Sequence, residues 1–156
     1  MNAKEVVDAL RKRHGAVGRE WAFFDELRAG TGYKNIRKGM NPEQRFDAWA
    51  INLYPSKGHM TIAYEVKVSR SDFLHEISNP TKREQALQHS NEFYFAVPTG
   101  LVRPDEIPEE CGLLYVAEDL TTKVIKKAPY RNEVLLTWGL LASIARRVVK
   151  QNVNAG

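Results

Sequence analysis

The sequence predicts an α/β protein, a three-layer α/β/α sandwich around a mixed sheet, from three features. Residues 45–53 and 62–68 each alternate apolar and polar side chains and flank a turn that contains Pro55 and Gly58, as in a β-hairpin. A short apolar run at 93–97 lies after helical segments and has the character of a buried strand. A long amphipathic segment at 132–150 predicts a terminal helix. Helices placed before, between and after strands favour a sheet covered on both faces.

The elements before the hairpin are predicted from their end signals. A helix is expected over 3–13, ending at Gly15, and a second helix over 17–28, closed by Gly30. A strand at 33–37 and a loop at 39–43 complete this part of the chain.

The elements after the hairpin are also marked by their ends. Ser69 and Asp72 have the spacing of a capping box, as do Thr81 and Glu84, which predicts helices over 71–77 and about 81–90. Two further strands are expected at 112–116 and 123–125, joined by a turn at 118–121.

The composition suits one globular domain spanning residues 1–156. Hydrophobic residues make up 43% of the chain and charged residues 27%, enough apolar material for a core of its own. Cys111 is the only cysteine, which excludes a disulfide framework and a cysteine-rich zinc site and favours a reducing compartment. Lys4 and Glu5 interrupt any leader-like apolar stretch, and no apolar run is long enough to span a bilayer, so we expect a cytoplasmic location.

The formal net charge of +4 is compatible with a nucleic-acid partner without establishing one. Basic residues gather at 11–14, at 34–38 and at 146–150, and solvated helix ends and loops are the simple explanation of each group taken alone. Beside an acidic metal site, however, such groups would draw phosphates toward carboxylates that repel them. The residues that we expect to contact DNA are Lys34, Arg37, Lys38, Arg70 and Lys82.

Three charged residues of the hairpin are predicted to converge. If the hairpin folds about Ser56, position 47 falls opposite position 65, and opposed residues of an antiparallel pair share a face with Cβ atoms roughly 5 Å apart. Asp47 and Glu65 therefore meet, and Lys67, two residues beyond Glu65, shares their face. Asp47 is also expected to share its face with Trp49, so the charges lie at the edge of an apolar layer, where ionised groups are costly unless paired or metal-bound.

This arrangement suits a hard divalent cation. The carboxylates of Asp47 and Glu65 and the carbonyl of Val66 supply three oxygen ligands, and Mg²⁺ prefers oxygen and retains waters. Lys67 is placed to hydrogen-bond an attacking water or a scissile phosphate. Glu20 is a further candidate ligand, since it falls on the apolar stripe of the helix predicted over 17–28; a rim carboxylate in solvent or paired with an arginine is the alternative. Without other support, an Asp followed by Glu-x-Lys can equally be an exposed ion pair on strands.

The motif resembles that of the PD-(D/E)XK nuclease superfamily, although Phe46 stands where that superfamily has a proline before the acid. A closer resemblance is to the MmcB-type DNA-repair proteins and their phage-encoded relatives. It rests on Arg45-Phe46-Asp47-Ala48, on Glu65-Val66-Lys67-Val68-Ser69-Arg70-Ser71-Asp72-Phe73, and on two later segments, 93–98 and 111–114. The residues at 80–85 depart from the pattern of that closer family.

The resemblance implies a restriction-endonuclease-like core and Mg²⁺- or Mn²⁺-dependent hydrolysis of DNA, in repair, recombination or phage DNA processing. It therefore implies a bacterial cell or a phage-infected host as the setting. It also implies a substrate-orienting polar residue on the helix after the Glu-x-Lys strand, for which we select Gln85; an ordinary exposed helix residue is the alternative. A second reading is a catalytically inactive DNA-binding or scaffold protein that keeps the fold, although the intact Asp, Glu and Lys argue against it.

The terminal helix carries a predicted apolar stripe of four residues. Two interpretations stay open for this stripe: packing against the core of the domain, or the seam of a homodimer. Its members are Leu136, Leu140, Ile144 and Val148.

Overall fold

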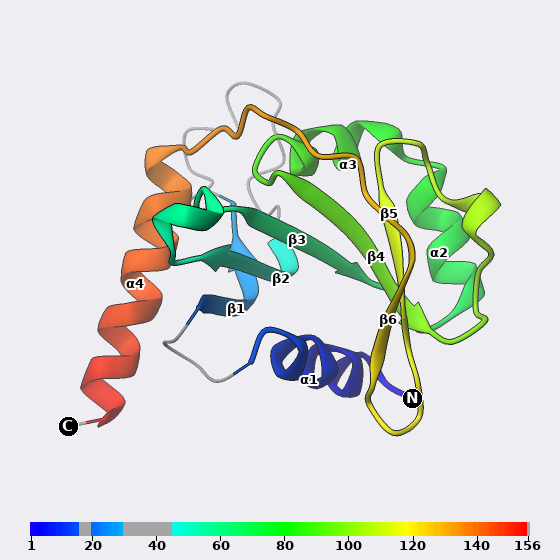
Figure 1. The fold of residues 1–156 in the computed structure, drawn as a ribbon, viewed down its shortest axis with the longest axis horizontal. Helices are drawn as coiled ribbons and strands as arrows, with labels where there is room; N and C mark the ends of the chain where they lie inside the picture. Colours follow the sequence, from blue (N-terminus) through cyan, green and yellow to red (C-terminus); the bar gives the residue numbers. More distant parts are fainter. Residues whose placement is uncertain (16–19, 30–44, 156) are drawn as a thin grey trace.

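The computed structural model describes residues 1–15, 20–29 and 45–155, and shows an α/β fold built on one open, mixed sheet (Figure 1). Its six strands lie side by side in chain order. The strands are β1 (Trp21–Arg28), β2 (Arg45–Asn52), β3 (Thr61–Val66), β4 (Glu92–Pro98), β5 (Gly112–Val116) and β6 (Thr122–Lys126). The helices are α1 (Ala3–Arg13), α2 (Arg70–Ile77), α3 (Pro80–Leu87) and α4 (Trp138–Ala155), with short 3-10 turns η2 (Pro55–Lys57) and η3 (Pro104–Glu106).

The strand directions follow from the connections between them. β1, β2 and β3 are antiparallel neighbours, and a short turn at 53–60 joins β2 to β3. β3 and β4 run parallel, since α2 and α3 carry the chain back along the sheet between them. β4 and β5 are also parallel, and β6 returns antiparallel to β5.

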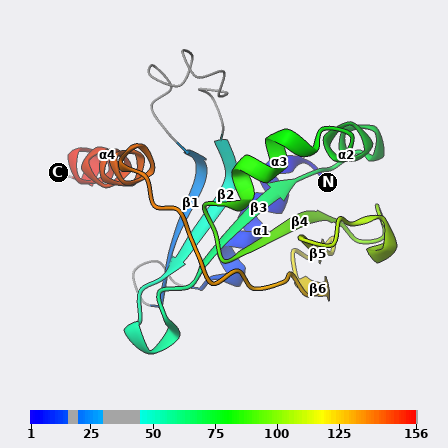
Figure 2. The ribbon, with the colours of Figure 1, turned by 90° about the horizontal axis from the view of Figure 1, so that it is seen from above.

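Helices cover both faces of the sheet, as the sequence predicts (Figure 2). On one face, Phe73 of α2, Leu87 at the end of α3 and Leu140 of α4 belong to one core together with apolar side chains of the strands. On the other face, Val6 and Leu10 of α1 pack in a second core with strand residues. The three-layer α/β/α architecture is confirmed. Within the described residues, none of the helices is both long and apolar enough to cross a membrane.

The hairpin has the predicted register. Ala48 pairs with Tyr64 and Ile51 with Thr61, which is the register that folds about position 56. The turn is made by η2, and Gly58 closes it with a φ of 66°, in the left-handed region that glycine adopts without steric cost.

The helix predicted over 17–28 is wrong for its described part, because residues 21–28 form strand β1. Phe24 and Leu27 do share one core, which is the spacing that suggested a helix. In the structure this spacing arises from an irregularity in the strand: Glu26 has a φ of 48° and no partner in the register, so the alternation shifts by one position. Pairing with β2 on both sides of Glu26 overrides the helical pattern.

Two of the helices, α3 and α4, differ from the prediction at their ends. No capping box forms at Thr81; α3 instead begins at Pro80, a residue favoured in the first turn, and ends at Leu87. α4 begins at Trp138, six residues later than predicted, and residues 132–137 form no regular secondary structure. The capping residue Ser69 is confirmed, since its side chain accepts a hydrogen bond from the Asp72 N–H. The strand and loop predicted at 33–43 lie outside the described residues.

Candidate active site

Asp47 lies where the alternation of β2 is interrupted. A regular strand would place positions 46 and 49 on opposite faces, yet Phe46 and Trp49 belong to the same core. Asp25 pairs with Ala48, and the register resumes two positions along, so Asp47 lies beside the irregularity of β1. This break frees the Asp47 side chain from ordinary packing at the end of the sheet.

The carboxylate of Asp47 reaches across to the neighbouring strand. The Val66 N–H donates to Asp47 Oδ2 over 2.8 Å. The Lys67 N–H points to the other side, where it donates to the Ala96 carbonyl. Because the N–H and C=O of one strand residue face the same neighbour, the Val66 carbonyl is directed toward the Asp47 side. The Asp47 carboxylate and the Val66 carbonyl, two of the predicted oxygen ligands, therefore lie next to each other across the two strands.

Glu65 and Lys67 project together from the end of β3. Lys67 Nζ lies 3.2 Å from Glu65 Oε1 and 3.7 Å from Glu76 Oε2 of α2. Lys82 of α3 approaches the same Glu76 oxygen, at 3.6 Å. We call Asp47, Glu65, Lys67 and Glu76 the charge cluster. The Ser69 cap starts α2 directly after β3, so the helix brings Glu76 over the strand end.

The charge cluster is largely withdrawn from water. The side chains of Glu65, Lys67 and Glu76 are only 12%, 16% and 11% exposed. Burial, followed by repulsion from Asp47 and Glu76, raises the pKa of Glu65 to about 7. Burial likewise raises the pKa of Asp47. Burial opposes the charge on Lys67, but the carboxylates of Glu65 and Glu76 raise its pKa above the ordinary value.

The donor set fits one hard cation. Among the described residues, no group of three or more His, Cys, Asp or Glu side chains is arranged to hold a metal ion. The predicted ligand set needs only two, Asp47 and Glu65, with a carbonyl as the third oxygen. Burial is the largest cause of the raised pKa of both acids, and a cation bound between them would favour the ionised form of each.

Glu20 is not brought to the charge cluster. The residue after it, Trp21, pairs with Asn52, at the far end of β2 from Asp47. Asn52 is five residues along the strand from Asp47, which is about 16 Å. The Glu20 carboxylate instead accepts a hydrogen bond from Asn52 Nδ2 at 3.0 Å. The predicted helix would have turned Glu20 inward; the strand places it beside the other end of β2.

Of the residues predicted to orient the substrate or contact DNA, the structure describes Gln85, Lys82 and Arg70. Gln85 is half-buried on α3, one turn after Lys82, so it lies on the helix face that carries Lys82 toward Glu76. Arg70 pairs with Glu106 of η3 and donates to the Leu101 carbonyl at 3.2 Å. The remaining candidates, Lys34, Arg37 and Lys38, lie outside the described residues.

Glu76 is the site residue that the sequence reasoning missed. It follows the buried Phe73 by three positions, and residues three apart share a helix face. The sequence carried one signal for Glu76: it is an acid on the buried face of a helix that directly follows the Glu-x-Lys strand.

A hollow of about 270 Å³ reaches Asp47 from the α1 side of the sheet. Asp25 lines it and is held by Arg147 at 3.0 Å and by Arg11 at 3.4 Å. The hollow gives access to the end of β2. It is lined by Ala3, Lys4, Val7, Asp8, Arg11, Asp25, Glu26, Asp47 and Val66.

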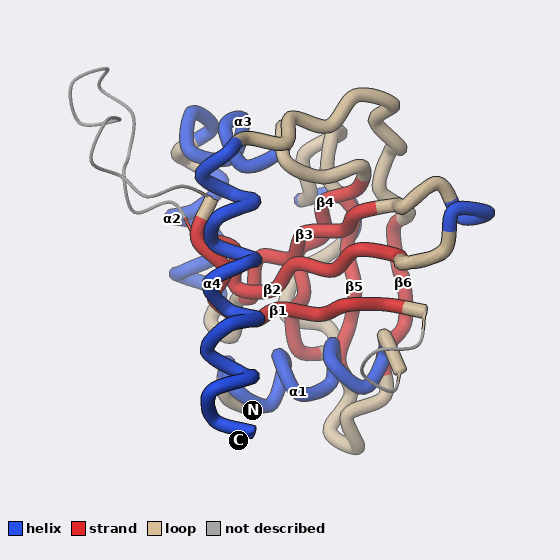
Figure 3. The backbone as a smooth tube through the Cα atoms, turned by 90° about the vertical axis from the view of Figure 1, so that its left-hand side faces the viewer, coloured by secondary structure: helices blue, strands red, loops and turns tan. Residues whose placement is uncertain are grey.

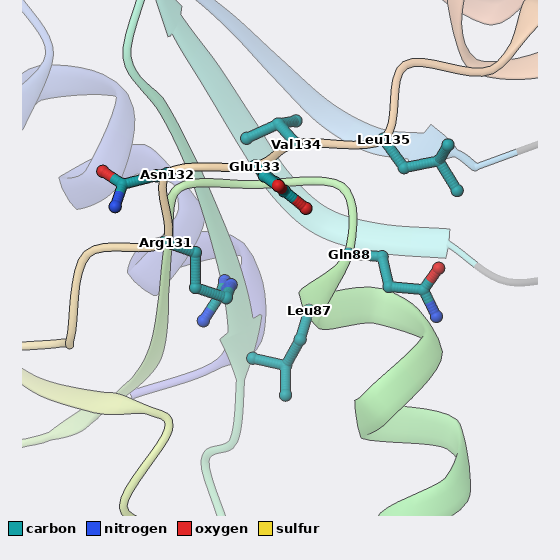
Figure 4. Close-up of a pocket in the computed structure, with 7 residues that line it drawn as sticks. All are labelled: Leu87, Gln88, Arg131, Asn132, Glu133, Val134 and Leu135. Carbon is teal, nitrogen blue, oxygen red and sulfur yellow. The ribbon is translucent and has the colours of Figure 1, made fainter.

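A larger hollow, about 730 Å³, lies away from the charge cluster, between the end of α3 and residues 131–135 (Figure 4). Leu87, Val134 and Leu135 supply apolar walls. The Arg131 guanidinium is engaged with the Ser90 carbonyl at 2.9 Å, so it braces the loop. Nothing in this lining resembles the paired acids of the charge cluster.

Comparisons with known proteins give information on the fold and none on the function. No family model matches the chain, and no curated protein matches it. Among solved structures, the chain is similar to SPO1766, a protein of unknown function from Silicibacter pomeroyi. The identity is 22% and the TM-score 0.59, and the match covers 99% of this chain and 90% of that one. The two chains share their overall fold.

Proposed function

We propose that this chain is a metal-dependent deoxyribonuclease that hydrolyses DNA phosphodiester bonds at the charge cluster, with Mg²⁺ or with Mn²⁺ in its place. The setting that we propose is DNA repair, recombination or phage DNA processing in the cytoplasm of a bacterial cell or a phage-infected host. The observation that carries the proposal is the convergence of Asp47, Glu65 and Lys67, largely buried, at one end of the β2–β3 hairpin.

Each residue of the charge cluster has a role in this proposal. The Asp47 and Glu65 carboxylates and the Val66 carbonyl would hold the cation, and the Val66 N–H fixes one Asp47 oxygen in place. A bound Mg²⁺ would acidify a coordinated water and neutralise charge that builds on the phosphate. Glu65 and Glu76 keep Lys67 protonated, so its ammonium group can donate a hydrogen bond to the attacking water or to the scissile phosphate.

The decisive experiment measures cutting of plasmid, branched and single-stranded DNA with Mg²⁺, Mn²⁺ or EDTA. Native protein is expected to cut with either metal and not with EDTA. Asp47→Asn and Lys67→Met should each lower the rate by roughly a hundredfold or more, as loss of one transition-state contact does. Asp105→Asn and Lys123→Met, the same changes at exposed positions, are matched controls that should cut like the native protein.

Two results would overturn the proposal. One is the absence of metal-dependent cutting by native protein on all three substrates; retained DNA binding would then identify an inactive scaffold. The other is cutting by Asp47→Asn and Lys67→Met at the native rate, which would place the chemistry elsewhere or in a contaminant.

A further inference from the structure

Helix α4 crosses β1, an edge strand of the sheet, and is attached to the domain by one face (Figure 3). Leu140 and Ser143 are buried, and Ile144 packs against the core from the same side. Arg147 adds a polar attachment, since its guanidinium donates to Asp25 Oδ1 at 3.0 Å. This face holds the helix in one orientation on the domain.

The opposite face of α4 is apolar and open. Trp138 is 85% exposed, Val149 60% and Val153 73%, and Leu141 is 42% exposed. With Ala145 these residues recur every three or four positions, so they form one continuous stripe, which we call the outer stripe. A helix that is apolar on two opposite faces is one that has packing partners on both.

The outer stripe and the seam predicted from sequence are different sets of residues. Leu140 and Ile144, two of the four residues of that predicted stripe, face the domain. Leu136 and Val148 are exposed. The structure therefore divides the predicted stripe, assigning part of it to the core.

The outer stripe has the size of one side of a protein interface. Trp138 alone presents roughly 200 Å². With the exposed leucine and valine side chains, the stripe offers on the order of 600 Å², against about 800 Å² that each partner buries in a standard interface. An apolar patch of this size is at the upper limit for a monomer.

We propose that the outer stripe pairs with the outer stripe of a second copy of this chain, with the two helices antiparallel and crossing at Ala145. The stripe has a small residue at its centre and larger ones toward both ends, so a two-fold axis beside Ala145 lets the helix backbones approach there. The same axis sets Trp138 of one copy against Val153 of the other. The interface is a property of the fold and does not depend on the proposed nuclease activity.

The charges beside the stripe favour a second copy over a membrane surface. Arg146 and Lys150 line a groove against Glu26 and Arg28 of β1, on one edge of the stripe. A helix that lies on lipid carries basic residues along the whole face opposite its apolar stripe, whereas the face of α4 opposite the outer stripe packs on the domain.

Sedimentation velocity of the full chain over a range of concentrations tests the interface. Native protein is expected to dimerise, and Val149→Glu should raise the dissociation constant at least about tenfold, because it places a carboxylate in a desolvated apolar contact. Asn154→Glu makes the same change in charge at an exposed position outside the stripe and should dimerise like the native protein. A circular dichroism melt of each variant establishes that it is folded.

The orientation is tested by oxidation. In a Trp138→Cys, Val153→Cys double variant, the antiparallel arrangement predicts a covalent dimer, while neither single variant should give one. Cys111 is buried and does not interfere. A native protein that is monomeric at all concentrations, a dimer unaffected by Val149→Glu, or a monomer that binds anionic phosphatidylserine vesicles through Trp138 would each overturn the proposal.

Discussion

Glu65 shares a nearly closed space with two other acids and one lysine, and its charge therefore opposes folding. Burial and the neighbouring Asp47 and Glu76 raise its pKa from an ordinary 4.5 to about 7. A carboxyl whose pKa is higher in the folded state binds more protons there than in the unfolded chain, so the free energy of unfolding falls as pH rises through this interval. The acids that suit the cluster to a cation also make it a source of instability when no cation is bound.

Glu65→Gln is expected to remove this dependence. In EDTA, the native free energy of unfolding should fall by up to about 3 kcal/mol between pH 4.5 and 7 through this group. The Gln variant should lack that loss and be the more stable protein at pH 8, while losing the proposed activity. Urea unfolding at several pH values measures the slope, and Glu109→Gln, at an exposed position, is the control. If the free energy of unfolding of Glu65→Gln falls with pH as steeply as that of the native protein, the pKa of Glu65 is not raised by folding.

Helix α1 is anchored to the sheet by a buried imidazole. His14 Nε2 lies 2.7 Å from the Tyr64 hydroxyl, and the ring contacts Trp21 edge-on. Burial, with a smaller contribution from the charge of Arg13, lowers the pKa of His14 to about 4. The helix is thus fixed by a residue that is neutral in the folded protein and protonates readily once exposed.

The attachment of α1 should consequently weaken in acid. Between pH 6.5 and 4 the unfolded chain binds a proton that folded His14 does not, so stability falls as pH falls, by up to about 3 kcal/mol. Because Glu65 acts in the opposite direction over much of this range, the measurement is best made in the Glu65→Gln background. There, His14→Phe should abolish the acid slope while lowering stability at pH 8, since the Tyr64 hydroxyl loses its partner. An unchanged acid slope in that double variant would contradict the assignment.

At the scale of the whole molecule, a cation bound at the cluster would join two layers of the sandwich. Asp47 lines the hollow on the α1 side of the sheet. Glu65 lies close to Glu76 of α2. Binding to the folded state alone stabilises it by mass action.

Mg²⁺ or Mn²⁺ should therefore raise the melting temperature of the native protein at pH 8. A concentration one hundred times the dissociation constant corresponds to about 2.7 kcal/mol. Asp47→Asn should remove the shift, and Asp105→Asn should retain it. Differential scanning calorimetry, with K⁺ at matched ionic strength as the control salt, makes the measurement without DNA. An equal shift in native protein and Asp47→Asn would place any bound metal elsewhere.

Local signals were sufficient for the hairpin and for most helices. Alternation of side chains and a Pro-Gly turn set the β2–β3 register, and with it the approach of Asp47 to Glu65, because both depend on residues close in the chain. Ser69 likewise caps α2 through its immediate neighbours. Such features are decided within about twenty residues, so the sequence by itself determined them.

Features that depend on distant partners were decided only by the tertiary structure. Residues 21–28 resemble a helix in isolation, and pairing with β2 makes them a strand, which removes Glu20 from the cluster. Glu76 enters the site because α2 packs back over β3. The terminal helix was evident from its pattern, but which of its apolar residues face the domain and which face outward depends on how α4 docks on the edge of the sheet. In each case the deciding free energy comes from burial between segments far apart in the chain, which periodicity within one segment does not report.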